Sequence, residues 1–189
     1  MQLIDHYFIM LERRCNAMGK KHRFMKAGVY TYIVKGYEAY TVKRPRDDHD
    51  GKLTGFSPFD GYEKLFFPLH LSESHWGLVV ILMMQRKIIY YDSSSGYAEV
   101  DLQIFKRWLN ECAGALNVPD FSADDWIVED MKDRVPQQTN CLDCGVYAMM
   151  FADFLSDDLE LSFNDDAIDF FRIKIAADIM RGQLSYPIS

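Results

Sequence analysis

The chain has few cysteines, and their number excludes a disulfide-stabilised scaffold. Its 189 residues contain four of them, at Cys15, Cys112, Cys141 and Cys144, which is too sparse for a fold held by disulfides. No apolar run approaches the ~18–20 residues of a membrane-spanning helix. The first residues include Asp5 and His6 and lack the small-residue cleavage site of a secretory signal. We therefore expect a reducing compartment, nuclear or cytoplasmic.

The chain also lacks the excess of positive charge that nucleic-acid binding requires. Its net charge is -7, whereas a general nucleic-acid binder would present a basic face. It has no internal repeats and no low-complexity tract, and 189 residues lie within the size range of one domain. We expect residues 1–189 to form a single domain that acts as a monomer and has neither nucleic acid nor a membrane as partner.

What the sequence does have is a change of hydrophobic period along the chain. Apolar residues at helical spacing predict a helix over residues 3–18, and a segment rich in Pro, Gly and Asp at 44–62 predicts a long surface loop. Short apolar runs with many β-branched and aromatic residues then predict three buried strands, with a hairpin turn near 85–87. These strands lie at 64–71, 75–84 and 87–92.

The remaining half of the chain is dominated by helical patterns. Amphipathic or buried helices are predicted at 100–116, 145–158 and 164–184, the last with Asn164 as its N-cap, and an edge strand at 125–130. The order of helix, strands and further helices packed on the sheet predicts an α+β fold.

Residues 138–147, QTNCLDCGVY, contain two cysteines in C-x-x-C spacing. A structural zinc site needs four ligands, and no second pair or suitable histidine pair accompanies this one. A thioredoxin-like redox pair would follow an early strand, but Cys141 and Cys144 come three quarters of the way along the chain. The third possibility is one activated thiolate. Cys144 directly precedes a predicted helix, whose first amides and dipole lower a thiol pKa, so it is the candidate nucleophile and Cys141 the bystander.

A thiolate nucleophile needs a base and a group that orients the base. His75 begins one predicted strand and Asp92 ends the next. A hairpin brings the start of its first strand beside the end of its second, so both side chains are expected at one end of the sheet. A single histidine at a strand end is usually structural, and the combination with Asp92 and Cys144 is what favours catalysis.

Three motifs resemble those of a known protease family. The segments HWGLVVI, YYDSSSG and PQQTNCLDCGVY resemble the ubiquitin-like-protein-specific cysteine proteases of the Ulp/SENP group, which process SUMO, and the resemblance extends over nearly the whole chain. It implies a papain-like fold of the adenain/Ulp type, with a central mixed sheet flanked by helices. It also implies a cysteine protease and isopeptidase, without cofactor or metal, that cleaves after the C-terminal Gly-Gly of SUMO in precursor maturation and in deconjugation from target lysines.

The resemblance assigns roles residue by residue. It makes Cys144 the nucleophile, His75 the general base, Asp92 its orienting group and Gln138, six positions before Cys144, the oxyanion-hole donor. Trp76 matches the tryptophan that covers the Gly-Gly end of the modifier, although a tryptophan beside a buried strand is often plain core. A second family tryptophan would fall before the first residue of this sequence.

Three other functions remain open at this point. The same chemistry could act on another ubiquitin-like modifier, or the fold could carry an acyltransferase or a non-catalytic modifier-binding module. A binding module need not keep Cys144, His75, Asp92 and Gln138 together. The pairing of Gln138 with Trp76 favours a protein tail that ends in glycine over the acyl donor of a transferase.

Overall fold

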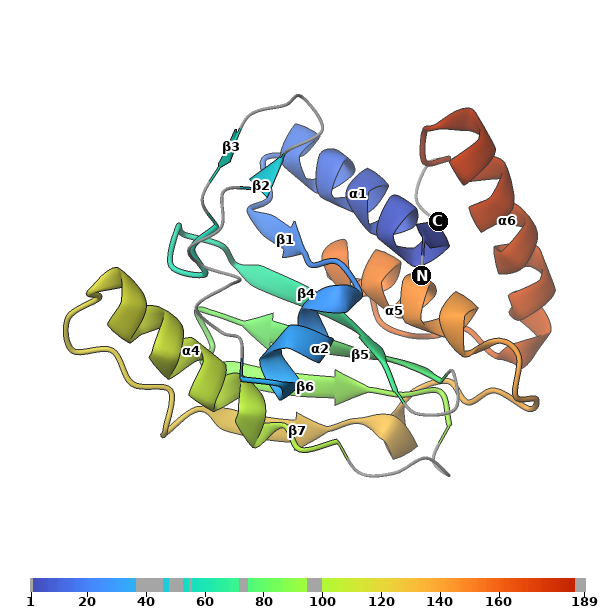
Figure 1. Cartoon of the computed structure of the whole chain (residues 1–189). Coiled ribbons are helices and arrows are strands. Elements are labelled where there is room, and N and C mark those ends of the chain that lie inside the picture. The colour runs from blue at the N-terminus through green and yellow to red at the C-terminus, as the bar shows by residue number, and fades with distance from the viewer. Residues whose placement is uncertain are drawn as a thin grey trace.

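The fold is organised around a mixed five-stranded sheet, seen in the computed structural model of Figure 1. The structure describes residues 2–36, 46–47, 53–54, 56–71, 75–94 and 100–185. The strand order is β1-β4-β5-β6-β7, in which the outer pairs β1/β4 and β6/β7 are parallel and the inner pairs are antiparallel. The strands are β1 (His22–Phe24), β4 (Lys64–His70), β5 (Trp76–Leu82), β6 (Lys87–Tyr91) and β7 (Ile127–Asp130).

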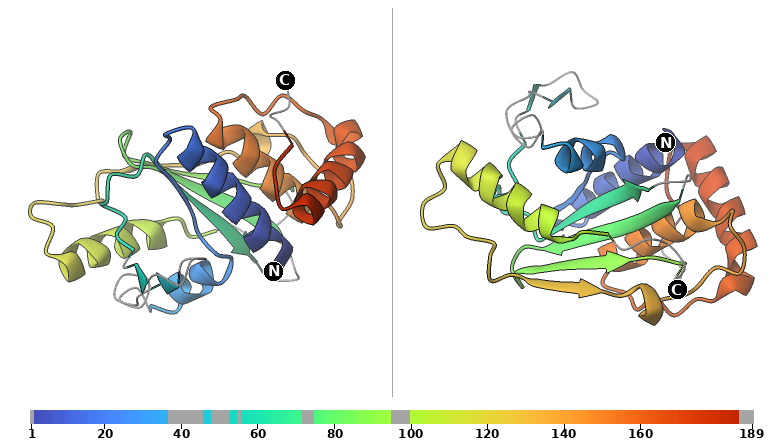
Figure 2. Two further views of the ribbon diagram at one scale, coloured as in Figure 1. Left: turned by 90° about the horizontal axis from the view of Figure 1, so that it is seen from above. Right: turned by 60° about the horizontal axis from the view of Figure 1, so that its bottom comes forward.

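Helices cover both faces of this sheet, as the two views of Figure 2 show. One face packs against α1 (Gln2–Ala17) and α5 (Cys144–Ser156), and α6 (Ile168–Arg181) packs on these two helices. The other packs against α2 (Gly28–Val34) and α4 (Gln103–Leu116). In the part of the chain that the structure describes, no helix is long and apolar enough to cross a membrane.

The continuous apolar runs of the central strands follow from this layering. Leu78 and Val80 of β5 belong to the core shared with α1, α5 and α6, whereas Val79 and Ile81 belong to the core shared with α2 and α4. Successive side chains of a strand point to opposite faces, and both faces here are covered. The strands therefore carry apolar residues at consecutive positions rather than at alternate ones.

The predicted architecture is confirmed, with differences at element boundaries. The sheet is mixed and flanked by helices, the hairpin joins β5 to β6, and β7 lies at the sheet edge. Helix α5 begins at Cys144 itself. Helix α6 begins later than predicted, because residues Asp165–Ala167 form a separate 3₁₀ turn, η3, and Asn164 makes no side-chain cap to it.

Some elements had no counterpart in the prediction. Strand β1 and helix α2 were not predicted, and a 3₁₀ turn, η2 (Lys132–Arg134), follows β7. The segment 44–62, predicted to be a loop, contains two paired two-residue strands, β2 (Arg46–Asp47) and β3 (Leu53–Thr54). Residues 44–45, 48–52 and 55 of that segment lie outside the described residues.

A buried polar network fixes the three helices of one face to one another. The carboxylate of Asp153, on α5, accepts hydrogen bonds from the Tyr7 hydroxyl at 2.6 Å and from Arg14 at 2.7 Å, both on α1. Lys174, on α6, lies 2.9 Å from Asp178 and 3.6 Å from Asp153. Buried charges are tolerated only when they are paired and hydrogen-bonded. The network therefore favours one docking position of α5, the helix that begins with Cys144.

Candidate active site

The two ends of the β5–β6 hairpin bring an imidazole and a carboxylate together. His75 directly precedes β5 and Asp92 directly follows β6. His75 Nε2 lies 2.7 Å from Asp92 Oδ1, and the side chains are only 1% and 2% exposed. The antiparallel register of the two strands places these residues at the same end of the sheet. This is the juxtaposition that the hairpin pattern predicted.

The third sequence-predicted residue, Cys144, meets this pair from the other side. It is the first residue of α5 and is buried. Burial opposes ionisation of the thiol, but hydrogen bonds from the His75 imidazole and the Trp76 backbone N–H, the imidazolium charge and the Gly145 N–H together lower the pKa of Cys144. The site therefore favours a thiolate.

The same contacts act in the opposite sense on the histidine. Burial favours the neutral imidazole, but hydrogen bonds with Asp92 and Cys144, and the negative charges of both, outweigh it and raise the pKa of His75 to about 9. A raised histidine pKa and a lowered cysteine pKa are the two halves of one ion pair. The arrangement therefore favours a thiolate–imidazolium pair over a neutral thiol beside a neutral imidazole.

The two cysteines of the C-x-x-C motif lie in different surroundings. Cys144 is buried against His75, whereas Cys141 is exposed, and neither forms a disulfide. Among the residues that the structure describes, no group of three or more His, Cys, Asp and Glu side chains is placed to hold a metal ion. The pair is thus divided into one thiol with a base beside it and one that faces solvent.

Asp92 is held by two further donors that sequence reasoning did not identify. The hydroxyl of Tyr90 donates to Asp92 Oδ2, and the Ser94 backbone N–H donates to Oδ1 at 2.9 Å. Burial and the neighbouring carboxylate raise the pKa of Tyr90, so its hydroxyl stays protonated and able to donate. Gly77 makes room for this ring. A Cβ at residue 77 would lie 2.7 Å from Tyr90 Cε2.

The loop before α5 positions two consecutive glutamines differently. The side-chain amide of Gln137 donates to the backbone carbonyls of Asp92, Lys132 and Val135, so it is committed to the loop itself. The side chain of Gln138 instead accepts a hydrogen bond from the Ser93 hydroxyl at 2.7 Å. The Gln137 amide is therefore bonded to backbone carbonyls, whereas the Gln138 amide is held by the side chain of Ser93, the residue after Asp92.

Trp76, the first residue of β5, lies over the start of α5. Its ring centroid is 4.6 Å from that of His70, and its Cδ1 would be 3.6 Å from a Cβ built on Gly145. The indole is half-buried and packs against the core around α5. It therefore has a packing role beside Gly145, the residue that follows Cys144.

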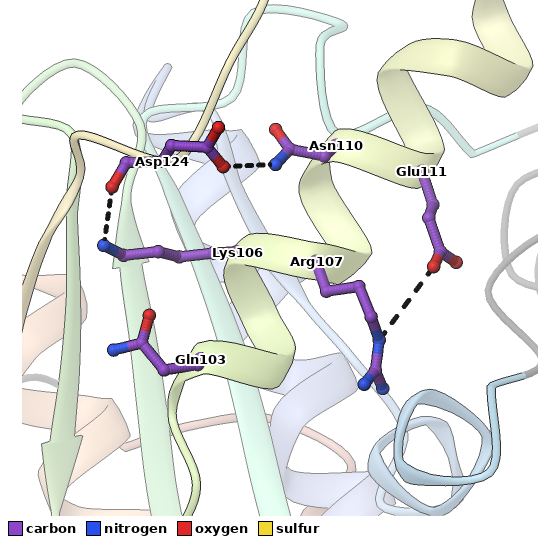
Figure 3. Close-up of a pocket in the computed structure, with 6 residues that line it drawn as sticks. All are labelled: Gln103, Lys106, Arg107, Asn110, Glu111 and Asp124. Carbon is purple, nitrogen blue, oxygen red and sulfur yellow. Dashed lines mark hydrogen bonds and ion pairs between the residues drawn. The ribbon is translucent and has the colours of Figure 1, made fainter.

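A polar hollow lies along α4, on the sheet face that is covered by α2 and α4 (Figure 3). It has a volume of about 660 Å³. Lys106 donates to the Asp124 carbonyl and Asn110 to the Asp124 carboxylate, each at 2.8 Å. These bonds hold Asp124 against α4, and no cysteine or histidine lines the hollow.

Comparison with known families identifies the chain. Residues 16–183 match the model of the Ulp1 protease family, C-terminal catalytic domain. The chain belongs to the Ulp1 protease family. The matched range includes the β5–β6 hairpin, the loop with Gln138 and the start of α5, which are the segments that form the candidate active site.

Family relatives and a solved structure agree with this membership. The chain is 27% identical over 183 residues to the ubiquitin-like-specific protease ESD4 of Arabidopsis thaliana, covering 95% of this chain and 37% of that protein. It is 29% identical over 123 residues to human sentrin-specific protease 2, covering 65% of this chain and 21% of that protein. The yeast C-terminal Ulp1 protease domain, solved in complex with the SUMO ortholog Smt3, superposes with a TM-score of 0.74 at 23% identity over 95% of this chain and 75% of that one. The chain thus spans less than half the length of these curated relatives.

The contact between Tyr90 and Asp92 gives a testable prediction. Tyr90→Phe removes one donor to the carboxylate and keeps the ring against Gly77. A hydrogen bond to a charged group contributes ~1.5–3 kcal/mol, so a partial loss of Asp92 positioning should lower kcat by about tenfold. The measurement is steady-state turnover at saturating substrate. Tyr91→Phe is the control, because Tyr91 points to the opposite core and packs near Phe151. Equal losses in both variants would contradict the role of Tyr90.

Proposed function

We propose that this chain is a cysteine protease and isopeptidase domain that cleaves after the C-terminal Gly-Gly of SUMO, both in precursors and in conjugates with target lysines. The observation that carries the proposal is the contact of Cys144 with a His75 that is itself bonded to Asp92. The relatives named for ubiquitin-like and sentrin substrates support the choice of modifier. We propose further that residues 1–189 form one catalytic domain, which acts as a monomer in the nucleus or cytoplasm.

In the proposed reaction the Cys144 thiolate attacks the carbonyl carbon of the terminal glycine. The resulting oxyanion would be stabilised by the Cys144 backbone N–H and the Gln138 amide, which are uncharged donors suited to charge that develops only in the tetrahedral state. The imidazolium of His75 would give its proton to the leaving amine, which is the lysine Nζ of a conjugate. Water activated by neutral His75 would then hydrolyse the thioester and return the modifier with a free carboxylate.

Substrate selection in this proposal depends on Trp76. Its indole lies beside Gly145 and the candidate nucleophile, so a modifier tail that reaches Cys144 would pass under the ring. Glycine fits such a slot because any side chain would meet the indole. A tail ending in Gly-Gly is therefore the substrate that we propose for this slot.

The proposal is tested with modifiers that carry a C-terminal electrophile. The protein is incubated with SUMO, ubiquitin and another ubiquitin-like protein so modified, and Cys144→Ala serves as the matched control. The expected result is a covalent adduct with SUMO that the variant does not form. An adduct with a different modifier alone would show that this modifier, and not SUMO, is the substrate. No adduct with any of them, together with acetylation of a protein by an acyl-CoA donor, would favour an acyltransferase.

The pH dependence of kcat/KM gives a further prediction. As pH falls through the lowered pKa of Cys144, the thiolate is protonated and activity is lost. As pH rises through the pKa of His75, raised to about 9, the imidazolium is lost and activity falls again. We expect a bell-shaped profile with its acid limb below the ~8.5 of an ordinary thiol and its alkaline limb near 9. A rate that rises steadily with pH beyond this range would argue against a preformed ion pair.

A further inference from the structure

Ser93 links the end of β6 to the loop that carries Gln138. Its hydroxyl donates to Gln138 Oε1 at 2.7 Å, and its carbonyl accepts from the Gln138 backbone N–H at 2.8 Å. The serine is 1% exposed, so its hydroxyl has little access to solvent as an alternative partner. Two hydrogen bonds, one to the backbone and one to the side chain, thus hold Gln138 from the same residue.

A second contact of the Gln138 side chain determines the orientation of its amide, that is, where Oε1 and Nε2 lie. The nitrogen Nε2 donates to the backbone carbonyl of Asn140. A carbonyl oxygen can only accept, so the NH₂ end of the amide must face Asn140 and the oxygen must face Ser93. The Ser93 hydroxyl completes this assignment because it can donate to Oε1. A rotation of the amide by half a turn would place two oxygens against each other at Asn140.

We propose that Ser93 is a positioning residue, which sets the orientation of the Gln138 amide so that an N–H and not the carbonyl faces the developing oxyanion. This inference rests on the proposed function. The NH₂ group has two N–H bonds, one directed at Asn140, and the second supplies the donor. The reversed amide would present Oε1, a partial negative charge, to the oxyanion and would oppose the reaction.

Two consecutive residues, Asp92 and Ser93, would then position both the proposed base and the proposed oxyanion donor. Asp92 orients His75, the proposed base, and the next residue, Ser93, orients Gln138, the proposed oxyanion donor. Both residues follow the end of β6 at Tyr91, where the Ser94 N–H closes on the Asp92 carboxylate.

A double-mutant cycle separates this role from general support of the fold. Gln138→Ala should lower kcat by ~10²–10³, the cost of one oxyanion donor. Ser93→Ala should lower kcat by about tenfold with little change in KM, a part of that cost, and it should add nothing in the Gln138→Ala background. An equal loss from Ser93→Ala in both backgrounds, or no loss in either, would overturn the proposal.

The matched control is Ser156→Ala. Ser156 is also fully buried, and its hydroxyl donates to the Asp153 carbonyl at 2.8 Å, at the far end of α5 from Cys144. This variant should lose thermal stability as Ser93→Ala does, while its kcat stays at the wild-type value. A tenfold loss of kcat in Ser156→Ala would mean that any missing buried hydroxyl slows the enzyme.

A measurement without substrate decides the inference even if the proposed function fails. In ¹⁵N-labelled protein, the side-chain NH₂ resonances of Gln138 are those that disappear in Gln138→Ala. Ser93→Ala should lower their heteronuclear NOE toward the values of solvated glutamines, whereas Ser156→Ala should not. A Gln138 side chain that stays as ordered without the Ser93 hydroxyl would show that Ser93 does not position it.

Discussion

Cys144→Ala is expected to abolish cleavage, and Cys141→Ser is expected to retain most of it. Only Cys144 begins α5 and bonds to His75, and its pKa is lowered there, whereas Cys141 is exposed. Loss of the nucleophile in a serine protease lowers kcat by ~2 × 10⁶, and a comparable loss is expected here. Cys144→Ser should also be inactive, because a hydroxyl in this contact does not ionise near neutral pH.

The comparison is made by single-turnover cleavage of a modifier with a fluorogenic C-terminal amide. Thermal unfolding of each variant serves as the control for folding. If Cys141→Ser lost as much activity as Cys144→Ala while it unfolded at the wild-type temperature, both thiols would take part. That outcome would restore a paired-cysteine mechanism and remove the division between the buried and the exposed thiol.

Asp92→Asn should give the second largest loss and should also move the pH profile. In a serine triad the same change lowers turnover by ~10⁴, and the loss should be smaller here because a thiol is more acidic than a hydroxyl. The hydrogen bond with Asp92 is the strongest of the contacts that raise the pKa of His75. Its carboxylate charge is absent in the variant, so the alkaline limb of kcat/KM should move to a pH below 9.

Asp130→Asn is the matched control for this prediction. Asp130 ends the neighbouring strand β7, but its carboxylate accepts from the Lys132 backbone N–H at 2.9 Å and not from an imidazole. This variant should keep both the turnover and the alkaline limb of the wild type. Unchanged values in Asp92→Asn would remove Asp92 from the mechanism, and equal shifts in both variants would point to a long-range charge effect.

The fold could be predicted from the sequence where burial of an element requires a clear hydrophobic pattern. β4, β5 and β6 are apolar at successive positions because both faces of the sheet are covered. β1 has only three residues, two of them His22 and Arg23, and its parallel pairing with β4 depends on how α1 packs. The late start of α6 has a similar origin. Asp165 accepts hydrogen bonds from Thr139 and Tyr147. The turn before α6 is therefore bonded to the loop before α5 and to α5 itself, and α6 begins after it.

The candidate site was predictable to the extent that secondary structure determines it. Hairpin geometry places His75 beside Asp92, and the start of a helix favours a thiolate at Cys144, while the choice of Gln138 over Gln137 came from the family motif. The supporting contacts of Tyr90 and Ser93 were not predicted. They depend on the space left by Gly77 and on the path of the chain after β6, which no local pattern records. The catalytic roles themselves remain predictions.

The assembly of the site from distant segments has a consequence for biosynthesis. Synthesis proceeds from the N-terminus, so the ribosome makes His75 and Asp92 before it makes Cys144. The thiol gains its base and the N–H of Trp76 only when α5 docks on the finished sheet. Until then it has the acidity of any cysteine in an unfolded chain. Under the proposed function, a nascent or partly unfolded copy therefore lacks the paired thiol and imidazole on which cleavage depends.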